Sequence, residues 1–116
     1  MYRTVLKSKV HRATVTEANL DYEGSITIDA ALMKKADLLA GEKVEVFNMS
    51  NGSRFETYVI KGKKDSGVVC LNGPAAHLGS VGDRVIIVSY LMVEDKRAPS
   101  VKPKIVHVDE RNKPRD

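Results

Sequence analysis

The feature that most constrains the fold is a series of short segments rich in β-branched residues and separated by turn-forming residues. Valine, isoleucine and threonine favour strands, whereas Asn-Gly pairs and clustered glycines interrupt them. The segments cover residues 4–16, 25–28, 43–49, 54–61, 68–71, 85–90 and 104–108. About seven short strands with only one or two helical turns predict an all-β fold, a small closed or nearly closed β-barrel.

The chain length predicts one domain. The 116 residues can bury a single hydrophobic core but not two, so residues 1–116 form one unit. Residues 94–104 are charged and carry Pro99 and Pro103, and they lead into the last strand. The polar residues 109–116 follow that strand, and we expect them to be a mobile tail.

One short helix is expected after the second strand segment. Asp29 is a favourable N-cap, and Leu32, Ala36 and Leu39 recur at nearly helical spacing. Gly41 is placed to end the helix as the residue after its C-cap. The connection before the strand at 25–28, residues 17–21, is polar. Beyond the helix, alternation turns Val44 and Val46 toward the core.

The first strand segment carries two cations of interest. Strict alternation places one set of side chains on one face and a second set on the other. The two sets are Lys7, Lys9, His11 and Ala13, and Leu6, Ser8, Val10 and Arg12. Lys9 and His11 therefore point the same way. An exposed polar face explains this pattern, and so does a site for an anionic ligand.

The strongest turn signal in the chain is Asn51-Gly52, which predicts a hairpin into the strand at 54–61. Alternation puts Arg54 and Tyr58 on one face of that strand and Thr57 on the other. A twist or a bulge would be needed for the three side chains to converge on one ligand.

A chemically distinctive pair, Gly24-Ser25, stands at the entrance of the strand at 25–28. Glycine has no Cβ, so it can adopt strained backbone angles and leave its carbonyl open to attack. A serine hydroxyl one residue later could attack that carbonyl and cut the chain. Taken alone, however, a Gly-Ser pair is more often a surface turn.

Charge and composition argue against several classes of protein. The net charge is +4, with basic and acidic residues interleaved, and aromatic residues make up 5% of the chain with no tryptophan. This pattern favours a solvated surface over a nucleic-acid-binding face. No stretch approaches the roughly 20 apolar residues that span a bilayer, so no membrane segment is expected.

Cys70 is the only cysteine, which excludes an intramolecular disulfide and indicates a reducing, cytoplasmic compartment. Because it lies in an apolar run, we interpret it as an inert buried thiol. His11, His77 and His107 lie far apart without ligand-like neighbours, so no metal site is expected.

Four segments in fixed order extend this interpretation. They are Lys9–Thr16, Asp21–Ser25, Asn51–Tyr58 and Asn72–His77. Together they resemble the pyruvoyl-dependent L-aspartate α-decarboxylases, and the resemblance runs from about residue 1 to residue 110. It implies a double-psi β-barrel that assembles into a homotetramer, with active sites between neighbouring subunits.

The resemblance also implies self-processing. Ser25 would attack the Gly24 carbonyl, with Thr57 supporting the oxyanion, and cleavage would yield a β chain, 1–24, and an α chain, 25–116. Ser25 would become an N-terminal pyruvoyl group, a covalent cofactor that takes the place of pyridoxal phosphate. Through a Schiff base with this group, L-aspartate would lose CO2 and give β-alanine for pantothenate biosynthesis. Neither metal nor pyridoxal phosphate is implied.

Roles for further residues follow from the same resemblance. Tyr58 matches the proton donor, a part that suits a phenol protonated at neutral pH. Substrate-binding positions match Lys9, Arg54, Thr57, Gly73, Pro74 and Ala75, and pocket positions match His11, Tyr22 and Asn72. The family often has alanine where this chain has Pro74. Since proline has no N–H to donate, substrate contact would use the Ala75 N–H or the Gly73 carbonyl.

Two other classes of function stay open from the sequence. One is an N-terminal-nucleophile hydrolase, in which Ser25 survives cleavage with its hydroxyl free. The other is a non-enzymatic basic β-barrel that binds a partner with the Gly24-Ser25 bond intact. The sequence also leaves open whether cleavage is spontaneous or needs a helper protein.

Overall fold

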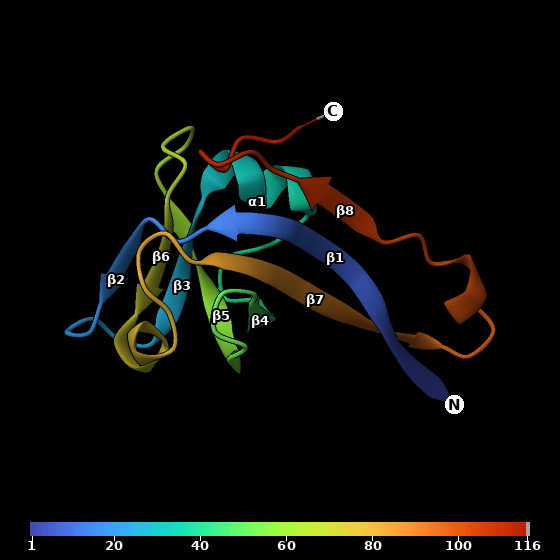
Figure 1. Ribbon diagram of the computed structural model, residues 1–116. Coiled ribbons are helices and arrows are strands. Elements are labelled where there is room, and N and C mark those ends of the chain that lie inside the picture. Colours follow the sequence, from blue (N-terminus) through green and yellow to red (C-terminus); the bar gives the residue numbers. More distant parts are fainter. Residues whose placement is uncertain (116) are drawn as a thin grey trace.

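The computed structural model describes residues 1–115 and consists mainly of strands (Figure 1). A single α-helix and two short 3-10 helices complete the described part of the chain. The strands are β1 (Tyr2–Thr14), β2 (Glu17–Asn19), β3 (Ser25–Asp29), β4 (Lys43–Asn48), β5 (Arg54–Gly62), β6 (Val69–Asn72), β7 (Arg84–Glu94) and β8 (Lys104–His107). The helices are α1 (Ala30–Ala36), η1 (Gly73–His77) and η2 (Ala98–Ser100).

The strands form one eight-stranded sheet in the order β2-β6-β3-β5-β4-β7-β1-β8. The pairs β1–β8, β2–β6 and β3–β5 are parallel, and the remaining pairs are antiparallel. Parallel neighbours require crossover connections, so the chain wraps around itself instead of forming a simple meander. The predicted all-β class with a small barrel-like sheet is therefore confirmed.

Alternating apolar side chains build the core. Ile26 and Ile28 of β3, Val44 and Val46 of β4, and Leu71 of β6 are all fully buried. The inward direction predicted for Val44 and Val46 is confirmed. Each such side chain contributes about 1.5–3 kcal/mol by leaving water, so this face of the sheet holds the barrel together.

Strict alternation fails in the second half of β1. The pairing of β1 with β7 shifts between Val10 and Ala13, and Arg12 has a φ of 67°. Such a bulge rotates the following side chains. Ala13 therefore joins Val10 in the core, and the prediction that it shares a face with Lys9 and His11 is wrong.

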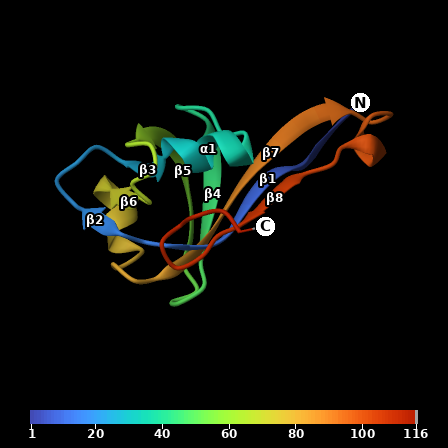
Figure 2. The ribbon, with the colours of Figure 1, turned by 90° about the horizontal axis from the view of Figure 1, so that it is seen from above.

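β7 is longer than expected, β1 starts two residues earlier than expected, and both strands extend beyond the compact part of the molecule (Figures 1 and 2). Pairing runs on to Tyr2 and Glu94, because each strand end satisfies the backbone groups of the other. We call Tyr2–Leu6 with Tyr90–Glu94 the arm. The arm carries exposed apolar side chains, of which Met92 is 69% exposed.

The helix starts where predicted but ends sooner. Asp29 is the N-cap, and its carboxylate accepts the N–H of Ala31, the second residue of α1. The C-cap is Asp37, in the left-handed region with a φ of 58°. Leu39 is consequently outside the helix and 70% exposed. Gly41 does not end the helix, as had been expected; it lies in the next turn and donates its N–H to the Val59 carbonyl at 2.8 Å.

Residues 109–115 pack against the barrel, in contrast to the mobile tail expected for 109–116. Asn112 is buried, and its Nδ2 donates to the carbonyls of Thr14 and Gly67, each at 2.8 Å. Its Oδ1 accepts the Thr14 N–H at 2.7 Å. One buried carboxamide thus ties the C-terminal segment to β1. Asp116, the last residue of the expected tail, lies outside the described residues.

The polar connection expected at residues 17–21 contains a strand, β2, that pairs with β6. Glu17 lies opposite Cys70, and Asn19 lies opposite Asn72. β6 is therefore enclosed between β2 and β3, which places its side chains in the interior of the fold.

Candidate active site

Ser25 opens β3 and is completely buried, with 0% of its surface exposed. The cross-strand partner of Ser25 is Asn72 of β6, whose Nδ2 donates to Ser25 Oγ at 2.8 Å. Ser25 Oγ in turn lies 3.4 Å from the Glu23 carbonyl, to which it donates a long hydrogen bond. A surface turn would leave this hydroxyl in water. The structure instead holds it in a defined orientation within the fold.

The glycines near Ser25 are required by close packing. The φ angle of Gly24 lies outside the left-handed region, so the strained glycine expected there is not found. The left-handed residue is Gly73, with a φ of 60°. A Cβ on Gly73 would lie 2.5 Å from the Tyr22 carbonyl oxygen and 2.8 Å from the Gly24 nitrogen. A Cβ on Gly24 would lie 3.2 Å from Cδ of Pro74. The loop at 73–74 thus lies directly on the Gly24 backbone.

A pocket of about 300 Å³ opens beside Gly24. Several of the predicted site residues line it together. The lining residues are Gly24, Phe55, Glu56, Thr57, Tyr58, Pro74, Ala75 and Leu78. Tyr58 is 41% exposed, so it is accessible to a ligand.

Strand register explains this convergence. In the parallel pairing of β3 with β5, Ile26 lies opposite Val59. Ser25 and Gly24 precede Ile26 as Tyr58 and Thr57 precede Val59, so parallel pairing brings these residues to the same end of the two strands. The pairing of β4 with β5 shows no shift between Tyr58 and Arg54, so the convergence of Thr57 with Tyr58 requires no bulge.

Arg54 does not line this pocket. It lies four residues before Tyr58, about 13 Å away along an extended strand. Its guanidinium lies 4.5 Å from the centroid of the Phe47 ring, its cross-strand neighbour, in a cation–π contact. Within one chain, Arg54 and Tyr58 therefore do not converge on the same ligand.

Lys9 and His11 lie on β1, which β4 and β7 separate from β5 in the sheet. His11 lines a different pocket, of about 570 Å³, together with Arg12, Arg84 and His107. The rings of His11 and His107 meet edge to face, with centroids 5.3 Å apart. Burial lowers the pKa of His11, and the charges of Lys9, His107 and Arg12 lower it further. His11 is thus kept mainly neutral near pH 7.

The two remaining pocket candidates differ in their environments. Tyr22 is exposed, and its phenol does not line the pocket beside Gly24, although its carbonyl touches the Gly73 backbone. Asn72 is buried and contacts Ser25 directly.

Sequence reasoning missed two polar neighbours of Asn72. Its Nδ2 also donates to Thr27 Oγ1 at 2.9 Å, and its Oδ1 accepts from the Cys70 thiol at 3.1 Å. The signal was present in the polar and apolar alternation of residues 25–28 and 69–72. Paired as antiparallel strands, the two segments place Ser25, Thr27, Cys70 and Asn72 on one face.

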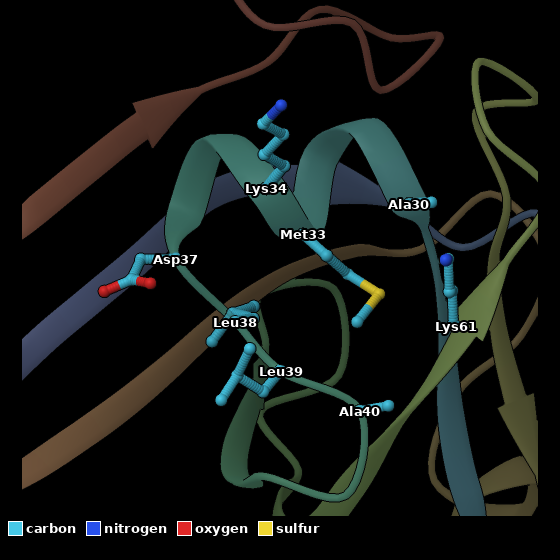
Figure 3. Close-up of a pocket in the computed structure, with 8 residues that line it drawn as sticks. All are labelled: Ala30, Met33, Lys34, Asp37, Leu38, Leu39, Ala40 and Lys61. Atoms are coloured by element: carbon cyan, nitrogen blue, oxygen red, sulfur yellow. The ribbon is translucent and has the colours of Figure 1, made fainter.

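A third pocket, of about 380 Å³, lies beside α1 and contains none of the predicted site residues (Figure 3). The Met33 thioether reaches into it above Leu38 and Leu39, whereas Lys34 points away from it (Figure 3). Within residues 1–115, no helix is long and apolar enough to cross a membrane. The same residues contain no group of three or more side chains suited to hold a metal ion.

Comparison with known proteins identifies the family. The family model described as aspartate decarboxylase matches residues 1–115. The aspartate 1-decarboxylase of Thermoanaerobacter pseudethanolicus is 56% identical over 114 residues, which cover 98% of this chain and 97% of the relative. That of Pelotomaculum thermopropionicum is 60% identical over 113 residues, covering 97% and 86%. That of Caldicellulosiruptor saccharolyticus is 61% identical over 109 residues, covering 94% and 85%. The chain therefore belongs to the aspartate decarboxylase family, as its motifs predicted.

Proposed function

We propose that this protein converts L-aspartate to β-alanine and CO2 after cutting its own chain between Gly24 and Ser25. The observation that carries the proposal is a fully buried serine hydroxyl, held by Asn72 Nδ2 at 2.8 Å. Gly24, the residue before this serine, lines a pocket of about 300 Å³ together with Thr57 and Tyr58. Family membership supports the same reaction.

Self-cleavage uses groups of this chain alone. Ser25 Oγ attacks the Gly24 carbonyl carbon, the C–N bond breaks, and an ester forms while the Ser25 nitrogen becomes an amine. Thr57, which lines the same pocket as Gly24, supports the oxyanion. Ser25 Cα then loses its proton as the Gly24 carboxylate leaves, which separates chain 1–24 from chain 25–116. Water hydrolyses the resulting dehydroalanine at the head of chain 25–116, which releases ammonia and leaves a ketone.

The surroundings of Ser25 fit the pyruvoyl group that would begin the longer chain. Gly24 and Gly73 bring no side chains into this space, and the pocket beside Gly24 gives a substrate access. When formed, the group supplies a carbonyl that accepts electrons as CO2 leaves, the chemistry that pyridoxal phosphate supplies elsewhere. Neither pyridoxal phosphate nor a metal is part of the proposal.

The residues of the pocket then bind the substrate and move a proton. The Tyr58 hydroxyl donates a proton to the carbon that has lost its carboxylate. Pro74 has no N–H, so the Ala75 N–H and the Gly73 carbonyl are the backbone groups that contact the substrate. Lys9 and Arg54 bind its carboxylates, with His11, Tyr22 and Asn72 completing the pocket.

Because Lys9, His11 and Arg54 lie outside the pocket of one chain, we infer that the complete site forms between subunits. The exposed apolar side chains of the arm are a suitable contact surface for a second copy. A homotetramer, as the family resemblance implies, would bring both sets of residues together. Cys70 is free and buried, which accords with a reducing cytoplasm, where β-alanine would serve pantothenate biosynthesis.

The test is the intact mass of the purified protein, combined with CO2 release from L-aspartate. We expect fragments 1–24 and 25–116, the latter resistant to Edman sequencing and trapped by borohydride in the presence of an amine. A free N-terminal serine would instead support an N-terminal-nucleophile hydrolase. One unbroken chain that releases no CO2 would refute the proposal, and salt-sensitive nucleic-acid binding by that chain would favour a binding module. Cleavage of the purified proenzyme on warming would show that no helper protein is needed.

A further inference from the structure

Two adjacent cross-strand pairs form a polar cluster beside the cleavage site. Ser25 lies opposite Asn72, and Thr27 lies opposite Cys70, in the antiparallel pairing of β3 with β6. Side chains two residues apart on a strand share a face, so all four side chains point the same way. The opposite face of both strands is apolar and fully buried. Cys70 and Asn72 are buried as well, so the hydrogen bonds of this cluster are shielded from water.

Every polar atom of the Asn72 carboxamide has a partner. Nδ2 donates its two hydrogens to Ser25 Oγ at 2.8 Å and to Thr27 Oγ1 at 2.9 Å. Oδ1 accepts from the Cys70 thiol at 3.1 Å. Two further acceptors lie near this thiol, the Leu71 carbonyl at 3.9 Å and the carboxylate of Glu17, which lies opposite Cys70 on β2. The contact to Asn72 Oδ1 is shorter than that to Leu71.

The thiol decides which end of the amide faces Ser25. Hydroxyl groups both donate and accept, so Ser25 and Thr27 tolerate either orientation of the carboxamide. A thiol is a weak donor, and its sulfur is a weak acceptor. Turning the amide over would replace the S–H···O contact by an N–H directed at this weakly accepting sulfur, and a poorly satisfied N–H in a buried site is costly. Cys70 thus favours the orientation in which Nδ2 meets Ser25.

That orientation matters for the attacking oxygen. An N–H directed at Ser25 Oγ stabilises the negative charge that develops there as the hydroxyl proton leaves. In the opposite orientation, Asn72 Oδ1 would accept a hydrogen bond from the Ser25 hydroxyl. The partial negative charge of Oδ1 would then repel the negative charge that develops on Ser25 Oγ. The orientation of the Asn72 amide therefore decides whether the buried Ser25 hydroxyl is favoured as a nucleophile.

We propose that Cys70 is a positioning residue for self-cleavage, which orients the Asn72 carboxamide so that its Nδ2 faces Ser25 Oγ. The inference rests on the proposed self-cleavage at Gly24-Ser25 and adds a residue to it. Burial raises the pKa of the Cys70 thiol, and the neighbouring Glu17 carboxylate raises it further, so the thiol stays a protonated donor at neutral pH. Cys70 is thus buried as expected from the sequence, yet it is not inert.

The experiment follows cleavage of freshly translated proenzyme by intact mass over time. Cys70→Val keeps an apolar side chain of similar volume but removes the donor, and we expect cleavage to slow roughly two- to tenfold. Cys70→Ser restores a donor and should restore most of the lost rate. Cys70→Ala is the second donor-free variant, should the valine variant fold poorly. Melting temperatures recorded beside the rates separate loss of folding from loss of positioning.

A double-mutant cycle tests whether Cys70 affects the cleavage rate through Asn72. If Cys70 acts through Asn72, Cys70→Val adds nothing to the slow cleavage of Asn72→Ala. Wild-type cleavage rates in both donor-free variants would overturn the inference, as would equal slowing in the Cys70→Ser variant. A further slowing in the Asn72→Ala background would also overturn it. Wild-type protein that never cleaves would refute the proposed function, whereas wild type and Cys70→Val cleaving equally fast would refute this inference alone.

Discussion

The serine side of the site and its cation side are built in different ways. We define the serine side as Gly24, Ser25, Asn72, Gly73 and Pro74, which touch one another within a single chain. The cation side comprises the cations Lys9 and Arg54 with the mainly neutral imidazole of His11, and the strands that carry them, β1 and β5, are separated in the sheet. None of the three lines the pocket beside Gly24.

Physical chemistry accounts for this difference. Neutral hydrogen-bonding groups and glycine backbones can be buried and matched as the chain folds. An unpaired cation would lose much of its hydration energy on burial, so cationic side chains stay near solvent until an anion or a partner arrives. The residues proposed for cleavage therefore meet within one chain, whereas Lys9 and Arg54 do not reach the pocket beside Gly24 in their own chain.

The largest expected effect concerns the serine side. Ser25→Ala removes the attacking oxygen, so the protein should remain a single chain of 116 residues and form no β-alanine. Ser89→Ala is the matched control, because Ser89 is equally buried and its Oγ has no hydrogen-bond partner among residues 1–115. Intact mass distinguishes the two variants. Fragments 1–24 and 25–116 in the Ser25→Ala sample would contradict the assignment.

The next prediction tests whether the cation side belongs to another subunit. Tyr58→Phe and Lys9→Ala should each cleave normally, and each should lower kcat/KM by up to about a hundredfold, because a charge-assisted contact or a proton donor is lost. Hybrid oligomers reassembled from both variants should then exceed the β-alanine formation of either parent. A hybrid oligomer can contain a site with both an intact Tyr58 and an intact Lys9 only if the two residues come from different subunits. Hybrids no better than their parents would place the site within one chain.

A smaller effect is expected where the serine side is packed most closely. Gly73→Ala would place a Cβ 2.5 Å from the Tyr22 carbonyl oxygen, whereas a Cβ on Gly52 meets nothing within 4 Å. Both glycines have positive φ angles, so both substitutions share a conformational cost of roughly 1 kcal/mol. Denaturant unfolding of the Ser25→Ala background, which stays uncleaved, should show Gly73→Ala less stable than Gly52→Ala by about 2 kcal/mol. Equal free energies of unfolding for the two variants would show that the backbone around Gly73 and Tyr22 shifts to make room for the added Cβ.

The smallest effect lies outside the site, at the cap of α1. Burial would raise the pKa of Asp29, but the N–H groups of Gly67, Ala31 and Asp65 outweigh it and lower this pKa below its ordinary value of 3.8. A carboxyl with a lowered folded-state pKa adds stability that is fully present above pH 4. That stability is lost as the pH falls through the folded-state pKa. Asp29→Asn should cost about 1–2 kcal/mol at pH 7 and less at pH 3. Acid unfolding measures this, and a cost independent of pH would contradict the carboxylate's role.

Local pattern predicted much of the fold, because strands and turns are signalled by nearby residues. The alternation around Val44 and Val46 predicted their burial, and Asn51-Gly52 does lie in the turn between β4 and β5, with Gly52 at a φ of 79°. The errors occurred where distant contacts override local preference. Asp37 ends α1 ahead of Gly41, and the bulge at Arg12 follows from pairing with β7.

The candidate site, like the fold, was predictable from the sequence only in part. Gly24-Ser25 and the motifs that follow were recognisable because the chemistry of cleavage needs those residue types in that order. The contacts of Thr27 and Cys70 to Asn72 left only a partial signal, since alternation shows which side chains of a strand share a face but not which strand pairs with it. The same holds for Gly73, whose small size is required by Gly24, a residue far away along the chain.

The sequence by itself determined the all-β class, the family and the pair of residues at which cleavage is proposed, because these depend on local pattern and residue chemistry. Only the tertiary structure decided that Asn72 lies 2.8 Å from Ser25, a contact between residues 47 positions apart. It also decided that Lys9 and Arg54 lie outside the pocket of their own chain. Both outcomes depend on strand order and register, which are set by the packing of the whole sheet and not by any single segment.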